Sequence, residues 1–455
     1  MIRFGPAGIP LSCKGRTLKD GIEDVHNLGL NAMEVQMVRV NVIERYPDEE
    51  EIGQAPLNLQ SDLIVEIVRK KGKKDVRITD LKETIKEEDT LITLSSGLVQ
   101  NWQELAVLGK MGKELDVELS MHTPYYMDLT SNNELTKKSI DSIHWSGMMT
   151  GQMEGKMVTT HIGLYGNLSK KAATERITNN IQELMEWWQE NKIPVRLGIE
   201  TSGRQEVWGS LDEILELCDA VDGPVPVINF AHYHARENGL LRSSADFADL
   251  LERTKRYVDG AYYTHFSGVE HESGNEKRVT PIKKGDLRFE PLAEMLVELN
   301  PTITIISSSP LLEHDAMYMK VIYERILTKK VMKGTKPKKG EGEEDDEELD
   351  EEEEVVRRTQ KAKASKPKAV VPKVEKPMVV KPKVVKPKAV KPKVEKVKEV
   401  KAKVVTPKVE KKKLPKAKPK ARPAPQANPK AKKPSKPVKA VKSAKQKKPA
   451  NSSKR

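Results

Sequence analysis

The chain has 455 residues and a formal net charge of +13, but this charge is divided unevenly along it. Residues 1–330 hold 39 Lys and Arg against 51 Asp and Glu, whereas residues 331–455 hold 41 against 16, so the two parts carry net charges of −12 and +25. This abrupt change excludes a single globular domain and predicts one large domain followed by a segment that does not build a core.

Cysteine content and hydropathy argue against a disulfide-rich, secreted or membrane-spanning protein. The two cysteines, Cys13 and Cys218, lie far apart without a CxxC spacing, which argues against a disulfide framework and a thiolate zinc site. Arg3 and Gly5 interrupt the N-terminal segment where a signal peptide would need an unbroken apolar stretch, and no segment approaches the ~18 apolar residues that span a bilayer. We therefore expect a soluble, cytoplasmic protein.

The first 330 residues alternate short β-rich segments with segments of helical periodicity, as in an α/β domain with parallel strands. Apolar residues recur at intervals of three and four over residues 170–191 and 244–258, which predicts helices there. Eight strands with intervening helices predict a (β/α)8 TIM barrel over residues 1–330. The predicted strands are residues 2–7, 32–38, 117–123, 157–163, 195–201, 225–231, 261–267 and 302–308.

One interval breaks this alternation. Residues 43–96, between the second and third predicted strands, form a longer connection than one loop and one helix require. Part of the interval, LIVEIVRKKGKKDVRITDL at residues 63–81, combines β-rich and charged stretches. We predict an inserted α/β segment on the upper rim of the barrel.

From residue 331 the composition changes twice. Residues 331–354 form a predicted acidic linker, in which positions 341–354 hold 12 acidic residues. Residues 355–455 hold 37 basic and 4 acidic residues and consist largely of Lys, Pro, Ala and Val. With almost no aromatic side chains, this tail cannot bury enough apolar surface to offset the entropy of ordering, so we predict disorder with local polyproline II character.

The Lys-rich, Pro-spaced tail resembles the C-terminal tails of linker histones. The resemblance implies binding to DNA through phosphate contacts and counterion release, without sequence preference. The alternative interpretation is a solvated run of charged residues that binds no partner. RNA is a second candidate partner, because contacts with phosphate hardly distinguish RNA from DNA. We expect nucleoid association through lysines such as Lys381, Lys383, Lys386, Lys388, Lys411, Lys412 and Lys413.

Imidazole and carboxylate side chains fall at the carboxyl ends of five predicted strands, where barrel enzymes carry their chemistry. Taken singly, each of these residues could be an ordinary hydrogen-bonded loop residue or an ion-pair partner. Together they would converge on one patch, and imidazole nitrogen and carboxylate oxygen are the usual ligands of zinc or manganese where thiolate is absent. The set that predicts a metal site, present or ancestral, is His122, His161, Glu200, His232 and His265.

A series of motifs runs in order through residues 3–316: RFGPAGIPLSCKGR, GLNAMEVQMVR, MHTPYYMDL, THIG, GIET, NFAHYHAR, THFSG and SSSPLLEHDA. This series resembles archaeal-type members of the endonuclease IV family, within the xylose isomerase-like barrel superfamily. The resemblance covers nearly all of the first 330 residues and none of the tail. It implies a barrel that holds up to three metal ions and cleaves the phosphodiester on the 5′ side of an abasic site in duplex DNA.

Carried over position by position, the resemblance gives each predicted ligand a role. His122 and His161 match the histidines of the first metal, and Glu200 matches the carboxylate that bridges the first and second metals. His265 matches the histidine of the second metal, and His232 matches a histidine of the third. Glu200 is also the candidate catalytic residue.

The resemblance also implies contacts with DNA outside the metal site. Tyr125, in the segment HTPYY, matches a tyrosine that helps to open the duplex, and Arg39 is a further candidate for this task.

The chain departs from the family pattern at three expected ligand positions. Asn229 stands in place of an aspartate of the second metal, Val279 in place of a histidine of the third, and Ser308 in place of a glutamate. The departures fall on the second and third metals and spare the first. Nearby residues that offer compensating side chains are Glu270, His271, Glu272, Glu276, His314 and Asp315.

These features predict a DNA-repair phosphodiesterase with a reduced site of Zn²⁺ or Mn²⁺, fewer than three ions, tethered to DNA by its tail. One alternative is a barrel without catalysis that binds DNA in the nucleoid. A second is a sugar isomerase or epimerase, whose metal set would be Glu200, Asn229, His265 and Ser308, with half of the expected acids missing.

Overall fold

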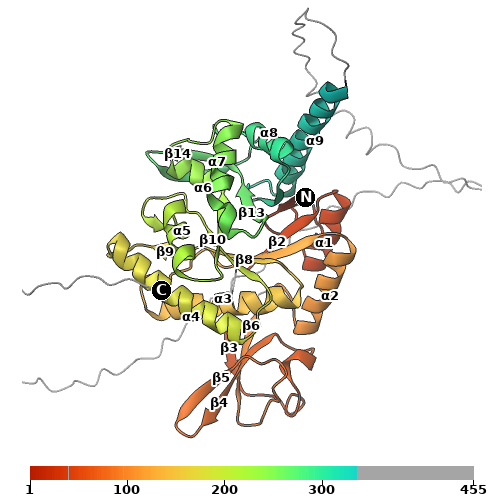
Figure 1. The fold of residues 1–455 in the computed structure, drawn as a ribbon. Helices are drawn as coiled ribbons and strands as arrows, with labels where there is room; N and C mark the ends of the chain where they lie inside the picture. Colours follow the sequence, from red (N-terminus) through yellow and green to blue (C-terminus); the bar gives the residue numbers. More distant parts are fainter. Residues whose placement is uncertain (39, 96, 336–455) are drawn as a thin grey trace, which may run out of the picture. The chain divides into compact units, whose positions relative to one another are not determined.

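The computed structural model describes residues 1–38, 40–95 and 97–335. Within these residues, eight parallel strands follow the order β1-β16-β13-β12-β10-β8-β7-β2 around a barrel (Figure 1). An isolated parallel bridge between Ala7 and Glu34 joins the β1 and β2 sides. The predicted TIM barrel is confirmed. The strands are β1 (Ile2–Pro6), β2 (Ala32–Gln36), β7 (Glu118–His122), β8 (Met157–Thr160), β10 (Arg196–Glu200), β12 (Val225–Asn229), β13 (Ala261–Phe266) and β16 (Thr302–Ser307).

Helices surround the strands, and polar caps fix where several of them begin. Asn133, Ser210 and Ser243 form reciprocal capping boxes at the starts of α3, α5 and α7, which satisfy backbone N–H groups that the helix leaves free. The helices are α1 (Leu18–Asn27), α2 (Trp102–Glu114), α3 (Glu134–Gln152), α4 (Lys170–Glu190), α5 (Leu211–Ala220), α6 (Phe230–Arg236), α7 (Ser244–Thr254), α8 (Glu290–Leu299) and α9 (Glu313–Thr335).

Helix bounds differ from the sequence predictions at two places. The predicted helix at 244–258 ends as α7 at Thr254 and continues as a 3₁₀ turn over Lys255–Tyr257. Helix α9 continues to Thr335, so the predicted boundary at residue 330 falls inside it. The rest of the predicted acidic linker and the predicted basic tail, with its lysines, lie outside the described residues. No helix in the described part of the chain is both long and apolar enough to cross a bilayer.

The barrel interior is packed below the strand ends, which gives the site a rigid floor. Its small buried cluster includes Ala32, Met157, Val227, Tyr263 and Ile306. Packing is so close that a Cβ at Gly198 would lie 2.4 Å from Cγ2 of Val227. Only glycine therefore lets β10 approach its neighbours here, two residues before the strand ends at the site.

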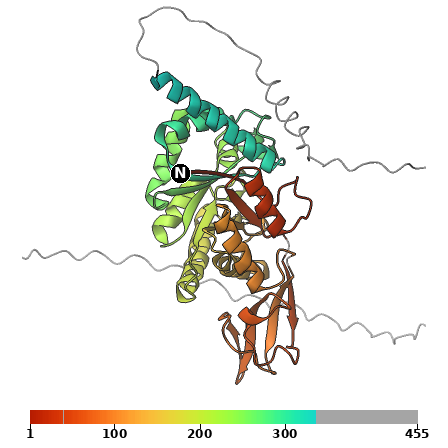
Figure 2. The ribbon, with the colours of Figure 1, turned by 90° about the vertical axis from the view of Figure 1, so that its right-hand side faces the viewer.

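The insertion between β2 and α2 is a β-sheet, so the predicted α/β segment is wrong in its helical part. Strands β3 (Asn41–Arg45), β4 (Ile64–Lys71), β5 (Lys74–Ile78) and β6 (Thr90–Ser95) pair antiparallel in the order β3-β6-β4-β5. Gly72, with a φ of 66°, makes the two-residue turn between β4 and β5 that converts the charged stretch into a hairpin. Figures 1 and 2 show this sheet projecting from one side of the barrel.

Buried polar contacts hold the insertion sheet to the helices of the barrel. Trp102 of α2 donates from Nε1 to the Ile64 carbonyl at 2.7 Å. Trp145 of α3 donates from Nε1 to the buried Glu66 carboxylate at 2.8 Å, and Arg77 pairs with the same carboxylate. These contacts fix the sheet beside α2 and α3.

An ion pair inside the insertion gives a test of its contribution to stability. Arg69 donates from Nε and Nη2 to the two oxygens of Asp89, each at 2.8 Å, and the Asp89 side chain is 0 % exposed. Arg69→Met is expected to lower the free energy of unfolding by about 3 kcal/mol, because it leaves that carboxylate buried without its cation. Lys70→Met, at the exposed next residue, should change it by less than about 0.5 kcal/mol. Urea unfolding compares the two; equal losses would contradict the role of the pair.

Candidate metal site

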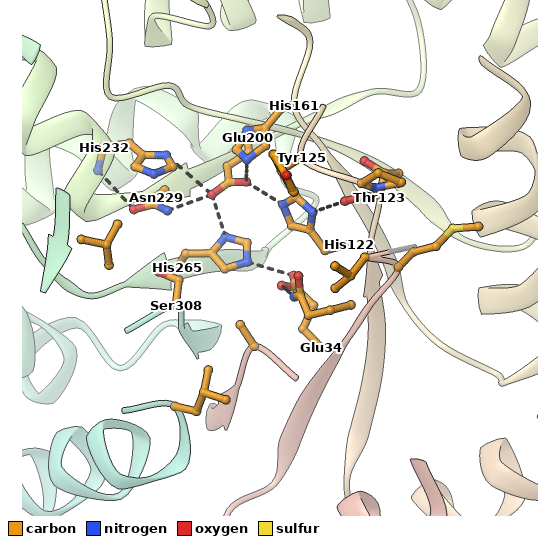
Figure 3. Close-up of a pocket in the computed structure, with 17 residues that line it drawn as sticks. Glu34, His122, Thr123, Tyr125, His161, Glu200, Asn229, His232, His265 and Ser308 are labelled. Atoms are coloured by element: carbon orange, nitrogen blue, oxygen red, sulfur yellow. Dashed lines mark hydrogen bonds and ion pairs between the residues drawn. The ribbon is translucent and has the colours of Figure 1, made fainter. Parts of the chain in front are cut away.

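The carboxyl ends of the barrel strands surround a cavity of about 290 Å³ (Figure 3). Its walls come from segments far apart in the chain, which meet because parallel strands end on the same side of a barrel. All five predicted metal ligands and the three departures line this cavity. Among its lining residues are Glu34, Gln36, His122, Thr123, Tyr125, His161, Glu200, Asn229, His232, His265, Val279 and Ser308.

His122, His161 and Glu200 offer ligand atoms to one point. His122 donates from Nδ1 to the Thr123 carbonyl at 2.7 Å, which leaves Nε2 to face Glu200 Oε2 at 2.8 Å. Nε2 of His161 lies 3.3 Å from the same oxygen. The three ligand atoms lie within 4.8 Å of one another, a spacing that one ion can bridge. The hydrogen bond from Nδ1 also fixes the ring orientation, as in many histidine ligands of metals.

Glu200 is the buried centre of the cavity, as Figure 3 shows. Its Oε1 accepts a hydrogen bond from Asn229 Nδ2 at 2.8 Å and lies 3.5 Å from Nδ1 of His265 and 3.7 Å from Nδ1 of His232. Burial raises the pKa of Glu200, but the charges of His161 and His265 and the hydrogen bond from His122 outweigh it and hold the pKa well below its usual value. The carboxylate therefore stays ionised although it is buried.

The same environment shifts the pKa values of His122 and His161 in opposite directions. Burial lowers the pKa of His122, but the hydrogen bond to Glu200 and the charge of Glu34 outweigh it and raise the pKa to about 9. Burial and the adjacent imidazoles lower the pKa of His161 to about 4, against the charge of Glu200. In the metal-free protein at neutral pH, His122 thus carries a proton, whereas His161 keeps a free lone pair.

Asn229 is a helix cap rather than a ligand. Strand β12 ends at this residue and α6 begins at Phe230, so the predicted strand at 225–231 ends two residues early and the rest of NFAHYHAR is helical. The Asn229 Oδ1 accepts from the backbone N–H groups of Ala231 and His232, both at 3.1 Å. Because Nδ2 donates to Glu200, both ends of the amide are occupied by protein groups.

The other two departures leave the cavity wall without a ligand. Val279, on β15 (Asn275–Thr280), brings an apolar side chain to the lining. The Ser308 hydroxyl is buried and makes no hydrogen bond to any described residue. The side of the cavity formed by these residues therefore lacks the acid and the imidazole that the family pattern implies.

His232 lies on the first turn of α6, apart from the cluster around Glu200 Oε2. It donates from Nδ1 to the Thr201 carbonyl at 2.8 Å, and its Nε2 faces Glu276 Oε2 at 3.2 Å. Glu276 comes from β15, in a hairpin with β14 (Gly268–Glu272), and is the compensating residue that reaches a predicted ligand.

The other proposed compensating residues are engaged elsewhere. Glu270 pairs with Arg278 and Glu272 with Lys277. Asp315 accepts from the Ile282 backbone N–H at 3.0 Å, and His314 lies exposed beside Glu313.

A second histidine cluster in the described part of the chain does not suit a metal. Nε2 of His234 lies 3.2 Å from Asp286 Oδ1, and His271 faces the same carboxylate at 3.3 Å. However, Nδ1 of His234 accepts a hydrogen bond from the Leu241 backbone N–H at 3.1 Å. The proton of the neutral ring is then on Nε2, so this nitrogen presents a hydrogen toward Asp286 and has no lone pair for an ion.

Sequence reasoning missed Glu34, which is buried in the cavity wall. Its Oε2 accepts hydrogen bonds from His265 Nε2 at 2.8 Å and from the Tyr263 hydroxyl at 2.9 Å, and its Oε1 accepts from Gln36 Nε2 at 2.7 Å. Burial raises the pKa of Glu34, but the charge and hydrogen bond of His265 outweigh it and lower the pKa. The signal in the sequence was an acid inside the otherwise apolar stretch AMEV.

The predicted DNA contacts are only partly within the described residues. Tyr125 borders the cavity with its side chain 75 % exposed and packs edge-on against Tyr126, with ring centroids 5.6 Å apart. An exposed aromatic ring at the mouth of a cavity is available for stacking on a ligand. Arg39 lies outside the described residues.

Comparisons with known proteins agree with the barrel. The family model described as xylose isomerase-like TIM barrel matches residues 91–313. The uncharacterized protein MJ0133 of Methanocaldococcus jannaschii is 29% identical over 216 residues, which cover 46% of this chain and 78% of that protein.

Solved structures similar to this chain include both nuclease and epimerase barrels. Endonuclease IV from Thermus thermophilus aligns with a TM-score of 0.45 and 14% identity, covering 71% of this chain and 99% of the other. A D-tagatose 3-epimerase-like protein aligns with a TM-score of 0.41 and 19% identity, covering 50% and 85%.

The proton on His122 gives a test of the site in metal-free protein. The folded pKa of about 9 lies above the ordinary value of 6.5, so the stabilisation is fully present below pH 6.5 and is lost as the pH rises through 9. Glu200→Gln should bring the pKa down toward 6.5 and remove this loss of stability. NMR titration of the histidine ring protons with chelator present measures the pKa.

Glu118→Gln provides the matched control, because Glu118 begins β7 at the opposite end from His122. An unchanged titration of His122 in Glu200→Gln would show that another group sets its pKa.

Proposed function

We propose that the barrel is a metal-dependent phosphodiesterase of the endonuclease IV kind, which acts on abasic or damaged DNA with one metal ion. The observation that supports this proposal is the convergence of Nε2 of His122, Nε2 of His161 and Oε2 of Glu200 in one cavity. These are the residues that match the first metal of the family pattern, and none of the three departures replaces one of them.

The donor set fits Zn²⁺ or Mn²⁺. His122, His161 and Glu200 would hold the ion. Nδ1 of His265 makes no hydrogen bond to any described residue and lies 3.5 Å from the other Glu200 oxygen, Oε1, so it would be the fourth donor. When bound, such an ion supplies Lewis-acid polarisation of a phosphate oxygen.

The protein's own groups orient and protect this set. Thr123 fixes the tautomer of His122 by accepting from Nδ1, and Asn229 holds Glu200 by donating to Oε1. Burial excludes water from Glu200, which strengthens each of these interactions. Tyr125, exposed at the mouth, would stack against a sugar or base.

The predicted basic tail completes the proposal. A segment with 37 basic and 4 acidic residues would bind the phosphate backbone of DNA and raise the local concentration of substrate at the barrel. We therefore also propose association with the nucleoid. RNA binding by the tail is the competing proposal, and the salt dependence of binding to each nucleic acid compares them.

A sugar isomerase or epimerase is a second candidate, favoured by the composition of the cavity. Among the described residues, neither lysine nor arginine lines it, so a phosphate would depend on the metal for its charge balance. A neutral sugar has no such need. Against this candidate, Asn229 and Ser308 lack the acids that its metal set requires.

Incision of a duplex with a single abasic site tests the nuclease. The full chain with zinc or manganese is expected to cut it, and Glu200→Gln and His122→Gln should each lower the rate about 100-fold or more, because each removes a ligand. His26→Gln, at an exposed histidine of α1, is the matched control and should keep the wild-type rate.

Two other outcomes would contradict the nuclease. Ketose epimerisation with manganese that depends on Glu200 would support the sugar enzyme. Salt-dependent duplex binding without incision or sugar turnover would support a barrel that only binds DNA.

Restoring the acid at Asn229 gives a second test, with opposite effects on two quantities. Asn229→Asp keeps the helix cap, since a carboxylate oxygen also accepts from Ala231 and His232, but it replaces the donor to Glu200 by a like charge. The metal-free protein should lose about 2 kcal/mol of stability, whereas metal affinity should rise about tenfold.

Thermal unfolding with chelator and competition with a zinc-binding dye measure the two quantities for Asn229→Asp. Asn41→Asp, on the exposed edge of β3, is the control for the charge alone. A fall in both stability and affinity would show that residue 229 does not face the ion.

A further inference from the structure

Glu34 is an acidic side chain buried inside the barrel, on a strand that no predicted ligand occupies. It lies on β2, two residues before the strand ends, and also takes part in the bridge with Ala7 where the barrel closes. The residue is 1 % exposed, so its carboxylate is out of reach of bulk water. A buried carboxylate is costly unless charge and hydrogen bonds compensate it, so its partners show what it does.

The partners of Glu34 fix the protonation pattern of His265. The carboxylate has no proton to donate, so Nε2 of His265, 2.8 Å from Oε2, must carry the hydrogen of this bond. Tyr263 and Gln36 donate to the same carboxylate and hold it in place. The side chain is thereby fixed from three directions and cannot turn away from the imidazole.

The opposite nitrogen of His265 is left facing the cavity. Its Nδ1 lies 3.5 Å from Oε1 of Glu200, and no described residue makes a hydrogen bond with it. Buried polar atoms are rarely left without a partner. A nitrogen held in this way, beside the carboxylate that His122 and His161 also approach, is placed to bind an ion.

We infer that Glu34 is a positioning residue for the metal site: it holds the proton of His265 on Nε2 and directs Nδ1 toward the ion as a fourth ligand. The inference rests on the metal site proposed above and names a residue outside that ligand set. It follows a general arrangement in which a carboxylate orients a histidine that binds a metal through its other nitrogen.

Charge balance gives Glu34 a second effect. With Asn229 and Ser308 in place of acids, Glu200 is the one carboxylate among the described ligand candidates around Nε2 of His122 and His161. One negative charge does not neutralise a divalent ion in a buried site. Glu34, linked to the site through His265, supplies the second charge and makes the loaded site neutral.

Zinc affinity of the full chain, measured by competition with a chelating dye, tests the inference. Glu34→Gln keeps the shape and an oxygen that accepts from Nε2 but loses the charge, so affinity should fall about tenfold. Glu34→Leu loses both, so affinity should fall about 100-fold. Glu118→Gln, the same change at the other end of the barrel, should leave affinity within about twofold of wild type.

A second readout separates positioning from general stability. In the zinc-loaded wild type, ¹H–¹⁵N NMR of the His265 ring should show the proton on Nε2 and none on Nδ1. In Glu34→Leu this preference should disappear even at temperatures where the variant is fully folded. A proton on Nδ1 in the loaded wild type, or an affinity unchanged in both Glu34 variants, overturns the inference.

Failure of the proposed nuclease is recognisable separately. Zinc binding that depends on Glu34 without incision of abasic DNA rejects the nuclease and keeps the role of Glu34. Incision of abasic DNA together with a zinc affinity that does not change in the Glu34 variants keeps the nuclease and rejects the role of Glu34. A wild type that binds neither zinc nor manganese rejects both.

Discussion

The site depends on one constraint, which is that the Glu200 carboxylate is ionised although the residue is only 3 % exposed. An unpaired charge at that depth would be strongly unfavourable, so the surrounding strand ends must compensate it. His122 and Asn229 do so with hydrogen bonds at 2.8 Å, and His161 lies 3.3 Å away. The proton on His122 and the orientation of the Asn229 amide follow from this single charge, whereas His161 stays neutral because burial and the adjacent imidazoles outweigh it.

The same groups suit two states of the site. Without a metal, protons on imidazoles balance the carboxylates of Glu34 and Glu200. With a divalent ion, those protons must leave, because a ring nitrogen cannot bind a proton and an ion together. In the proposed metal site, competition between protons and the metal would make ion binding weaker as the pH falls. This property belongs to the whole cluster instead of to any one ligand.

The barrel was predictable because its strands are buried on both faces and so form short apolar runs that turn signals separate. The meeting of His122, Glu200 and His265 in one cavity was also predictable, since the end of a strand in a barrel fixes where its side chain lies. The position of Glu34 in the site was not predictable, because it depends on contact with His265. That residue lies 231 residues away along the chain, and only the closed barrel brings it near. The hairpin in the insertion was not predicted because its turn depends on one residue, Gly72, within a charged stretch.

Asn229 shows why the loss of a ligand in the sequence does not describe the site that remains. The amide gives up a negative charge, yet it gains a donor that a carboxylate lacks, and this donor holds Glu200 in place at 2.8 Å. Its oxygen caps the start of α6 by accepting from backbone N–H groups, which an aspartate oxygen could do equally well. Val279 makes no such exchange, and Ser308 makes none with the described residues. His122, His161 and Glu200, the residues proposed to bind the ion, are present, and Asn229 supports Glu200 at the position of a second-metal acid, which is the physical reason to propose one ion instead of three.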